Sequence, residues 1–218
     1  VFRWVNPLSV TGAERLRALP NKGVLFVSNH QTVFADGIAI HQIMSAALSG
    51  DGDSTRGLRY LLRPHSSYYY VAAAETMASG LIPRVLAYGS AVCVERTWKE
   101  GALVVSRNVD LQGVSNIERA LSDGWVLTFP QGTTRPFAQG RIGTAHLIRA
   151  VRPIVVPVVV SGFYEAFGKS GLAFKHPGRP VRVCIKEPLA LDYDAAPDVL
   201  LSQVMDAIEQ SELHRAAA

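Results

Sequence analysis

Short apolar runs recur along this chain, and they are separated by loops and by segments of helical character. Six runs are rich in β-branched or aromatic residues: 24–27, 68–73, 91–94, 125–129, 154–160 and 181–185. The continuous runs indicate buried strands, whereas 181–185 alternates and indicates a strand with one face toward the core. Helical character is expected at 13–19, from Asp36 to the loop at 49–53, and at 115–121, 144–151 and 198–213. Five or six strands with interspersed helices predict an α/β fold with a mostly parallel central sheet flanked by helices.

Three local signals refine these expectations. Ser115 and Glu118 have capping-box spacing, which predicts a helix start at Ser115. Pro157 removes a backbone donor from the run at 154–160, which argues for an edge strand, a bulge or a special local role. The segment 198–213 carries an apolar stripe typical of one continuous amphipathic helix, formed by Leu201, Val204, Met205 and Ile208.

Length and composition narrow the class of protein. The 218 residues suit a single domain spanning 1–218, and 48% of them are hydrophobic against 18% charged. The net charge of +4 suits an anionic substrate or an anionic membrane surface. The sequence lacks the clustered Lys and Arg residues of a nucleic-acid-binding groove, so we expect no nucleic-acid partner. Cys93 and Cys184 have no metal-ligand or disulfide-framework spacing.

No run of 18 apolar residues is present, so no transmembrane span is expected within these residues. The chain begins at Val1 without a signal-peptide pattern, and an upstream membrane segment remains compatible with the sequence. Residues 81–88 form an apolar stretch with one Arg. Two interpretations stay open for it: a core-facing helix, or a surface that dips into lipid or lines an acyl channel.

Polar residues follow several of the predicted strands. His30 follows the first, with Asp36 six residues later, Arg96 follows the third, and 131–135 follow the fourth. Open α/β sheets place their sites at such carboxyl ends. A His with a carboxylate partner can deprotonate a hydroxyl. With no Gly-x-Ser-x-Gly elbow and no activated Cys, we expect direct attack of a substrate hydroxyl on an activated acyl group.

Four blocks in order make the chain resemble the glycerolipid acyltransferase family, which includes 1-acyl-glycerol-3-phosphate acyltransferases. The resemblance covers residues 24 to 188. The blocks are Asn29-His30-Gln31 through Asp36, then 89–96 (GSAVCVER), then 129–135 (FPQGTTR, against the family's Phe-Pro-Glu-Gly-Thr-Arg) and 154–158 (IVVPV).

That resemblance implies a role for each candidate residue. It implies that His30 is the general base, that Asp36 orients it, and that Arg96 binds the head group of the acceptor. Gln131, Gly132 and Thr133 would shape the acceptor pocket, with Arg135 as a further phosphate ligand and Pro157 on the acyl-donor side. The implied donor is an acyl-CoA or acyl-carrier-protein thioester and the acceptor a lysolipid. No covalent acyl-enzyme, metal or bound cofactor is implied, and a membrane-associated location on the cytoplasmic face is expected.

Two departures from the family pattern leave the acceptor open. His30 and Asp36 are separated by five residues instead of four, so the turn must absorb one residue before Asp36 can reach the imidazole. Gln131 replaces the family's Glu and removes a negative charge. Lysophosphatidate is the default acceptor. The alternatives are a lyso-aminolipid acceptor and a non-catalytic lipid-binding protein on the same fold.

Residues 162–182 carry two further patterns. Gly162 to Ser170 resembles a phosphate-binding P-loop, but its Gly-x5-Gly-Lys-Ser spacing is one residue too long, and Pro177 follows too soon for the required helix. The same region holds basic residues that are candidates for membrane contact or for an ordinary solvated face: Lys169, Lys175, Arg179 and Arg182.

Overall fold

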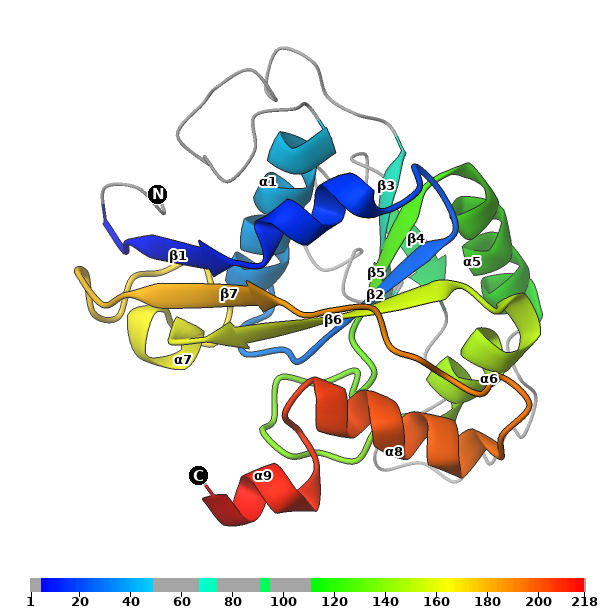
Figure 1. Ribbon diagram of the computed structural model, residues 1–218. Coiled ribbons are helices and arrows are strands. Elements are labelled where there is room, and N and C mark those ends of the chain that lie inside the picture. Colours follow the sequence, from blue (N-terminus) through cyan, green and yellow to red (C-terminus); the bar gives the residue numbers. More distant parts are fainter. Residues whose placement is uncertain (1–4, 49–66, 74–90, 95–110, 218) are drawn as a thin grey trace.

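The computed structural model describes residues 5–48, 67–73, 91–94 and 111–217. Within these residues a seven-stranded sheet has the order β1-β7-β6-β2-β5-β3-β4 (Figure 1). All neighbouring strands are parallel except β6 and β7. The predicted α/β fold with a mostly parallel sheet is therefore confirmed.

The six predicted runs all form strands, and one strand was missed. The strands are β1 (Leu8–Thr11), β2 (Val24–Ser28), β3 (Tyr68–Ala73), β4 (Ala91–Val94), β5 (Trp125–Thr128), β6 (Ile154–Ser161) and β7 (Val181–Ile185). β1 is a short edge strand whose residues alternate between half-buried and exposed. It has no apolar run, and only its parallel pairing with β7 makes it a strand.

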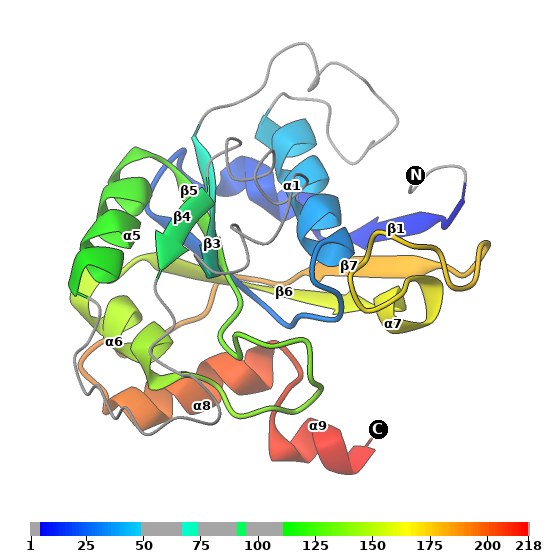
Figure 2. The same ribbon diagram turned by 180° about the vertical axis from the view of Figure 1, so that it is seen from behind.

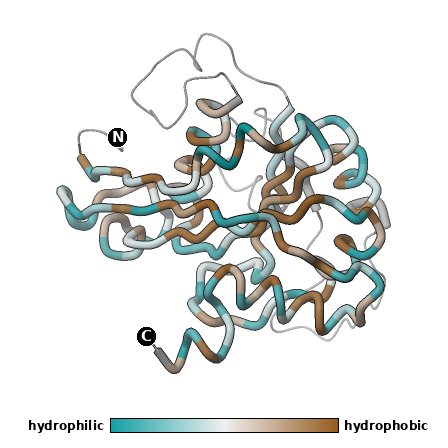
Figure 3. The backbone as a smooth tube through the Cα atoms, in the orientation of Figure 1, coloured by the Kyte–Doolittle hydropathy of each residue, from teal (hydrophilic) through white to brown (hydrophobic). Residues whose placement is uncertain are grey.

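Helices cover both faces of the sheet (Figures 1 and 2). They are η1 (Ala13–Ala18), α1 (Ala35–Leu48), α5 (Leu111–Asp123), α6 (Ile142–Val151), α7 (Phe163–Ala166), α8 (Pro197–Ala207) and α9 (Glu212–Ala217). One buried cluster joins the sheet to η1, α1 and α7, and a second joins it to α5, α6 and α8. Val24 and Phe26 belong to the first cluster and Leu25 and Val27 to the second, as alternation along a strand requires. Figure 3 shows the hydrophobic residues concentrated in these central strands.

β6 is an interior strand, so the edge interpretation of Pro157 is wrong. It lies between β2 and β7, and Pro157 pairs with Val27 of β2. The Lys186 N–H donates to the Pro157 carbonyl oxygen over 2.9 Å, just past the last residue of β7. Because a residue's N–H and C=O point to the same side of a strand, the missing donor faces β7 where β7 leaves the sheet. A central strand can accept a proline there.

Two predicted helix boundaries are wrong. α5 already includes Leu111, four residues before the predicted start at Ser115, and Val114 packs on the core with Ile117 and Leu121. The predicted helix 198–213 is two helices, α8 and α9. The chain leaves the helix at Ile208, and Glu209 takes a left-handed φ of 60°.

Candidate active site

His30 and Asp36 meet at the carboxyl end of β2. The distance from His30 Nδ1 to Asp36 Oδ2 is 3.0 Å, which is a hydrogen bond. Asp36 is the second residue of α1 and is fully buried, whereas the His30 side chain keeps 15% of its surface exposed. The extra residue between them is thus absorbed in the turn at 29–34.

The Asp36 carboxylate itself holds this turn together. Its Oδ2 accepts hydrogen bonds from the backbone N–H groups of Gln31 and Thr32, over 2.6 and 3.1 Å. Its Oδ1 accepts from the Gly37 N–H over 2.8 Å and from the Thr32 hydroxyl over 3.3 Å. The Thr32 hydroxyl oxygen in turn accepts from the Asp36 N–H. A carboxylate satisfied by so many donors can stay buried without a full counter-charge.

The contact with Asp36 decides how the His30 ring can react. The Asp36 carboxylate can only accept a hydrogen bond, so we assign the proton of the neutral ring to Nδ1, which donates to Asp36. The lone pair of Nε2 is then left available to a substrate. The imidazole also stacks on the Phe129 ring, with 4.0 Å between centroids and 24° between planes. Phe129 follows β5, the neighbour of β2, and the sequence had given it no role beyond its place in the third block. The ring is therefore oriented by a carboxylate on its edge and an aromatic ring on its face.

The residues on either side of His30 fasten the turn to the end of β6. The Asn29 side-chain amide donates to the Val160 carbonyl and accepts from the Val160 N–H, over 2.9 and 2.8 Å. Gln31 Oε1 accepts from the Phe163 N–H at the start of α7, over 2.9 Å. The Asn-His-Gln triplet thus has two hydrogen-bonded, positioning side chains around the candidate base. The triplet was the signal in the sequence, but it carries no hint of these partners.

A loop after α7 also packs against the turn that follows His30. The N–H groups of Val33 and Phe34 donate to the carbonyl oxygens of Lys169 and Ser170, both over 3.1 Å. Gly171 has a φ of 78°, and a Cβ placed there would lie 2.5 Å from the Ala35 backbone nitrogen. Glycine is therefore required both by the left-handed conformation and by the close approach.

Tyr164 lies near this buried carboxylate. Its hydroxyl oxygen is buried and has no hydrogen-bond partner among the described residues. Burial raises the pKa of Tyr164 above its ordinary value, and the negative charges of Asp36 and Glu165 raise it further. The phenol accordingly stays protonated next to the site.

Gln131 is buried and bonded within the protein. Its Nε2 donates to the Ala138 carbonyl oxygen over 3.0 Å and to Gln210 Oε1 over 3.1 Å. Gln210 Oε1 also accepts from the Phe137 N–H, over 2.9 Å. Gln210 lies between α8 and α9, so this network ties the third block to the C-terminal helices. It also explains why the helix predicted to reach Leu213 is interrupted.

Replacing Gln131 by glutamate, the family's residue, should destabilise this protein. A carboxylate at this position would face two acceptor oxygens and could donate to neither. Leaving such groups unpaired costs about 1–3 kcal/mol, and we expect the free energy of unfolding to fall by about 2 kcal/mol. Urea unfolding measures the change. Gln139→Glu, on an exposed side chain of the same loop, is the matched control and should unfold like the wild type. Equal stability of both variants would contradict the donor role of Gln131.

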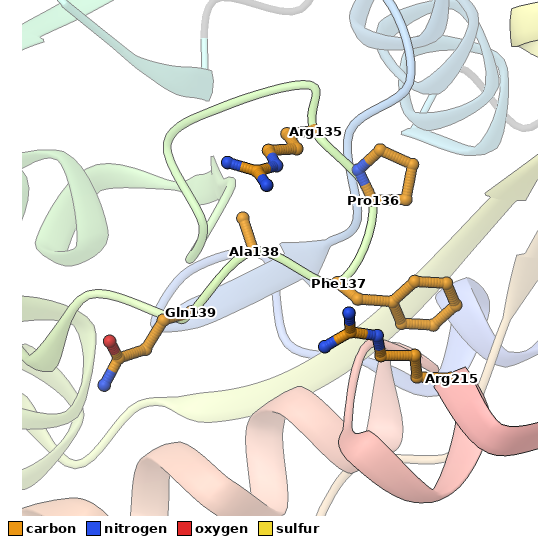
Figure 4. A pocket seen from close by; sticks show the side chains of 6 residues that line it. All are labelled: Arg135, Pro136, Phe137, Ala138, Gln139 and Arg215. Carbon is orange, nitrogen blue, oxygen red and sulfur yellow. The ribbon is translucent and has the colours of Figure 1, made fainter.

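The end of the third block and the residues that follow it line a pocket beside α9. Arg135, Pro136, Phe137, Ala138 and Gln139 line it together with Arg215, and its volume is about 470 Å³ (Figure 4). Figure 4 shows both guanidinium groups at this pocket, one from the loop and one from α9. Arg215 had no role in the sequence analysis, because nothing in the sequence relates α9 to the third block. Two cationic side chains suit an anionic group.

Gly132 and Thr133 shape the start of the same loop. The Gly132 N–H donates to the Phe129 carbonyl oxygen, and Gly132 takes a φ of 61°. A Cβ there would lie 2.5 Å from Nε of Arg141, so this guanidinium packs on the bare glycine backbone. Thr133 Oγ1 accepts from the Arg135 N–H over 3.3 Å. The loop thus brings a third arginine, Arg141, against the predicted pocket residues.

Arg96 and the apolar stretch 81–88 lie outside the described residues. The strand that precedes Arg96, β4, ends at Val94, and β4 is parallel to β3. Its carboxyl end therefore lies at the same edge of the sheet as the end of β2. The role assigned to Arg96 stays a prediction.

Comparison with known proteins identifies the class. The model of a family described as Acyltransferase matches residues 7–161, so the chain belongs to the acyltransferase family. A search of curated protein sequences found no match. The crystal structure of the 1-acyl-sn-glycerophosphate (LPA) acyltransferase PlsC from Thermotoga maritima is similar, with a TM-score of 0.56 and 15% sequence identity. The match covers 98% of this chain and 73% of that one, and it shows the same fold.

None of the helices that the structure describes is long and apolar enough to cross a bilayer.

Proposed function

We propose that this acyltransferase moves a fatty acyl group from an acyl-CoA or acyl-carrier-protein thioester to the free hydroxyl of a lysolipid, with 1-acyl-glycerol-3-phosphate as the first acceptor to test. The observation that carries this proposal is the 3.0 Å contact between His30 Nδ1 and the buried Asp36 carboxylate. It leaves Nε2 as the basic nitrogen of a ring that two neighbours hold in place.

The reaction needs one proton transfer in each direction. His30 Nε2 removes the proton of the acceptor hydroxyl as its oxygen attacks the thioester carbonyl carbon. Asp36 stabilises the imidazolium that forms. The tetrahedral intermediate then collapses, the carbon–sulfur bond breaks, and the thiolate leaves and takes the proton from Nε2. The products are an ester and a free thiol, and the enzyme returns to its starting state without a covalent acyl-enzyme.

Release of free thiol from the thioester tests the proposal directly. The wild-type protein should release thiol from a long-chain acyl-CoA or acyl-carrier protein only when a lysolipid is present. A panel of lysophosphatidate, other lysophospholipids and a hydroxy-acyl aminolipid, scored by product mass, identifies the acceptor. Product from the aminolipid alone would select that alternative. Absence of turnover with every donor and acceptor would instead favour a lipid-binding protein.

We further propose that Arg135 binds an anionic group of the substrate, supported by its place beside Arg215 at the pocket of Figure 4. Removal of one charge-assisted contact costs about 1.5–3 kcal/mol. Arg135→Ala should therefore raise the KM for a phosphorylated acceptor about tenfold or more and leave kcat nearly unchanged. Steady-state kinetics measures both, with the exposed Arg119→Ala on α5 as control. An unchanged KM would show that the acceptor is not held by Arg135.

A further inference from the structure

The positive charge of this chain is concentrated in one short segment. Five of its 22 Lys and Arg residues lie between positions 166 and 186, where there is no Asp or Glu. The other 17 basic residues are accompanied by all 18 acidic residues. The net positive charge of the protein therefore resides in this segment, which includes the loop from Gly168 to Arg179 that follows α7.

That loop also exposes two large apolar side chains. Leu172 is 46% exposed and Phe174 is 45% exposed, and the exposed Lys169 and Lys175 flank them. Within the described parts of the chain, no carboxylate forms an ion pair with Lys169, Lys175 or Arg179. We call these five side chains the basic–apolar patch: Lys169, Leu172, Phe174, Lys175 and Arg179. Cationic side chains around exposed Leu and Phe are typical of surfaces that enter the headgroup region of an anionic bilayer.

The loop is held in shape before any partner binds. The Gly168 N–H donates to the Ala173 carbonyl over 2.9 Å, and the Lys175 N–H donates to the Ala166 carbonyl over 3.0 Å. At its base, the Gly178 N–H donates to the Val5 carbonyl over 2.7 Å, and the Asn6 amide donates to the carbonyls of His176 and Arg179. A preorganised loop loses little conformational entropy on docking.

The same loop touches the candidate active site. Lys169 and Ser170 accept hydrogen bonds from the N–H groups of Val33 and Phe34, in the turn that joins His30 to Asp36. Figure 2 shows the gold loop beside the blue turn that leads into α1. If the protein bound a bilayer through this loop, the edge of the sheet that carries His30 would lie near the lipid.

We propose that the basic–apolar patch docks this protein on the surface of an anionic phospholipid bilayer, with Leu172 and Phe174 entering the interface and the cationic side chains pairing with lipid phosphates. Charge alone would also suit an acidic carrier protein. The two exposed apolar side chains of the loop, Leu172 and Phe174, favour the bilayer. The inference does not rest on the proposed acyl transfer, because binding to lipid is measured without a substrate.

Co-sedimentation with vesicles tests the proposal. The wild type should bind vesicles of phosphatidylcholine mixed with phosphatidylglycerol, should bind pure phosphatidylcholine far more weakly, and should be released by salt. Leu172→Ser/Phe174→Ser should lower the partition coefficient by about tenfold or more. Lys169→Gln/Lys175→Gln/Arg179→Gln should lower it roughly fivefold for each charge removed.

Two control variants match these changes elsewhere on the surface. Ile142 and Val199 are 46% and 45% exposed, so Ile142→Ser/Val199→Ser removes comparable apolar surface. Lys22→Gln/Arg119→Gln/Arg149→Gln removes three exposed charges. Both controls should bind like the wild type.

Several results would overturn the proposal. One is a wild type that does not sediment with anionic vesicles, and another is patch variants that bind them as well as the controls do. A third is a triple-charge variant that loses binding to an acidic acyl-carrier protein while keeping vesicle binding, which would make the patch a protein-docking surface. Because Phe174 packs on Phe167, with ring centroids 5.7 Å apart, circular dichroism should accompany the apolar variant. Leu172→Ser alone tests the same point without that contact.

Discussion

Replacement of His30 by alanine is expected to abolish acyl transfer and to leave the fold intact. General base catalysis contributes about 10²–10⁴-fold to a rate. Among the described side chains, only the Thr32 hydroxyl also bonds to Asp36, and a hydroxyl cannot act as a base in place of Nε2. We therefore expect kcat to fall by about 10³-fold. Asp36 keeps its bonds to the turn N–H groups in this variant, because only one of its partners is removed.

The measurement is lysolipid-dependent thiol release at saturating substrate, combined with circular dichroism and thermal unfolding. His146→Ala removes an exposed histidine of α6 and is the matched control. Full activity of His30→Ala would refute its role as the base. A collapse of the fold in that variant would contradict the separation of catalysis and stability that the hydrogen bonds imply.

Replacement of Asp36 by alanine should cost both activity and stability. The variant leaves the partly buried N–H of Gln31 and the buried N–H of Thr32 without an acceptor, and it also removes the partner of the Gly37 N–H and of the His30 ring. Removing one side of a buried charged network costs about 3–5 kcal/mol, a large part of the roughly 5–15 kcal/mol that stabilises a domain. For a chain of this size, such a loss lowers the melting temperature by roughly 10 °C.

Urea and thermal unfolding measure this loss. Asp198 is the matched control, because it is the second residue of α8 as Asp36 is of α1, but its side chain is exposed. Asp198→Ala loses only the favourable interaction with the helix N-terminus, about 0.3–1 kcal/mol. If Asp36→Ala were as stable as Asp198→Ala, the carboxylate would not be holding the turn, and its role would be confined to the imidazole.

The two variants together separate the functions of one hydrogen-bonded pair. We expect His30 to contribute to the reaction and little to stability, whereas Asp36 should contribute to both. The same distinction applies to Gln131, which was expected to shape the acceptor pocket. Its buried amide serves the packing of the C-terminal helices against the third block. If the pocket of Figure 4 receives the acceptor, its charge depends on Arg135 and Arg215, and the acceptor panel tests that dependence.

The strands and the position of the candidate site could be predicted from the sequence because their signals are local. A buried strand appears as a short apolar run, and a polar residue just after it lies at the carboxyl edge of a parallel sheet. That reasoning located six strands and placed His30, Asp36 and the third block at one edge. Four ordered blocks then identified the acyltransferase family.

What the sequence alone did not decide depends on contacts between distant residues. β1 is a strand only because β7 lies beside it, and Pro157 is tolerated in the interior because β7 departs at that residue. α8 ends before the predicted Leu213 because Gln210 bonds to Gln131, 79 positions away. The extra residue between His30 and Asp36 does not break their hydrogen bond, because the Asp36 carboxylate also accepts hydrogen bonds from N–H groups of the turn between them. Hydrogen bonds between residues far apart in the chain leave no periodic pattern in it, so only the tertiary structure could show them.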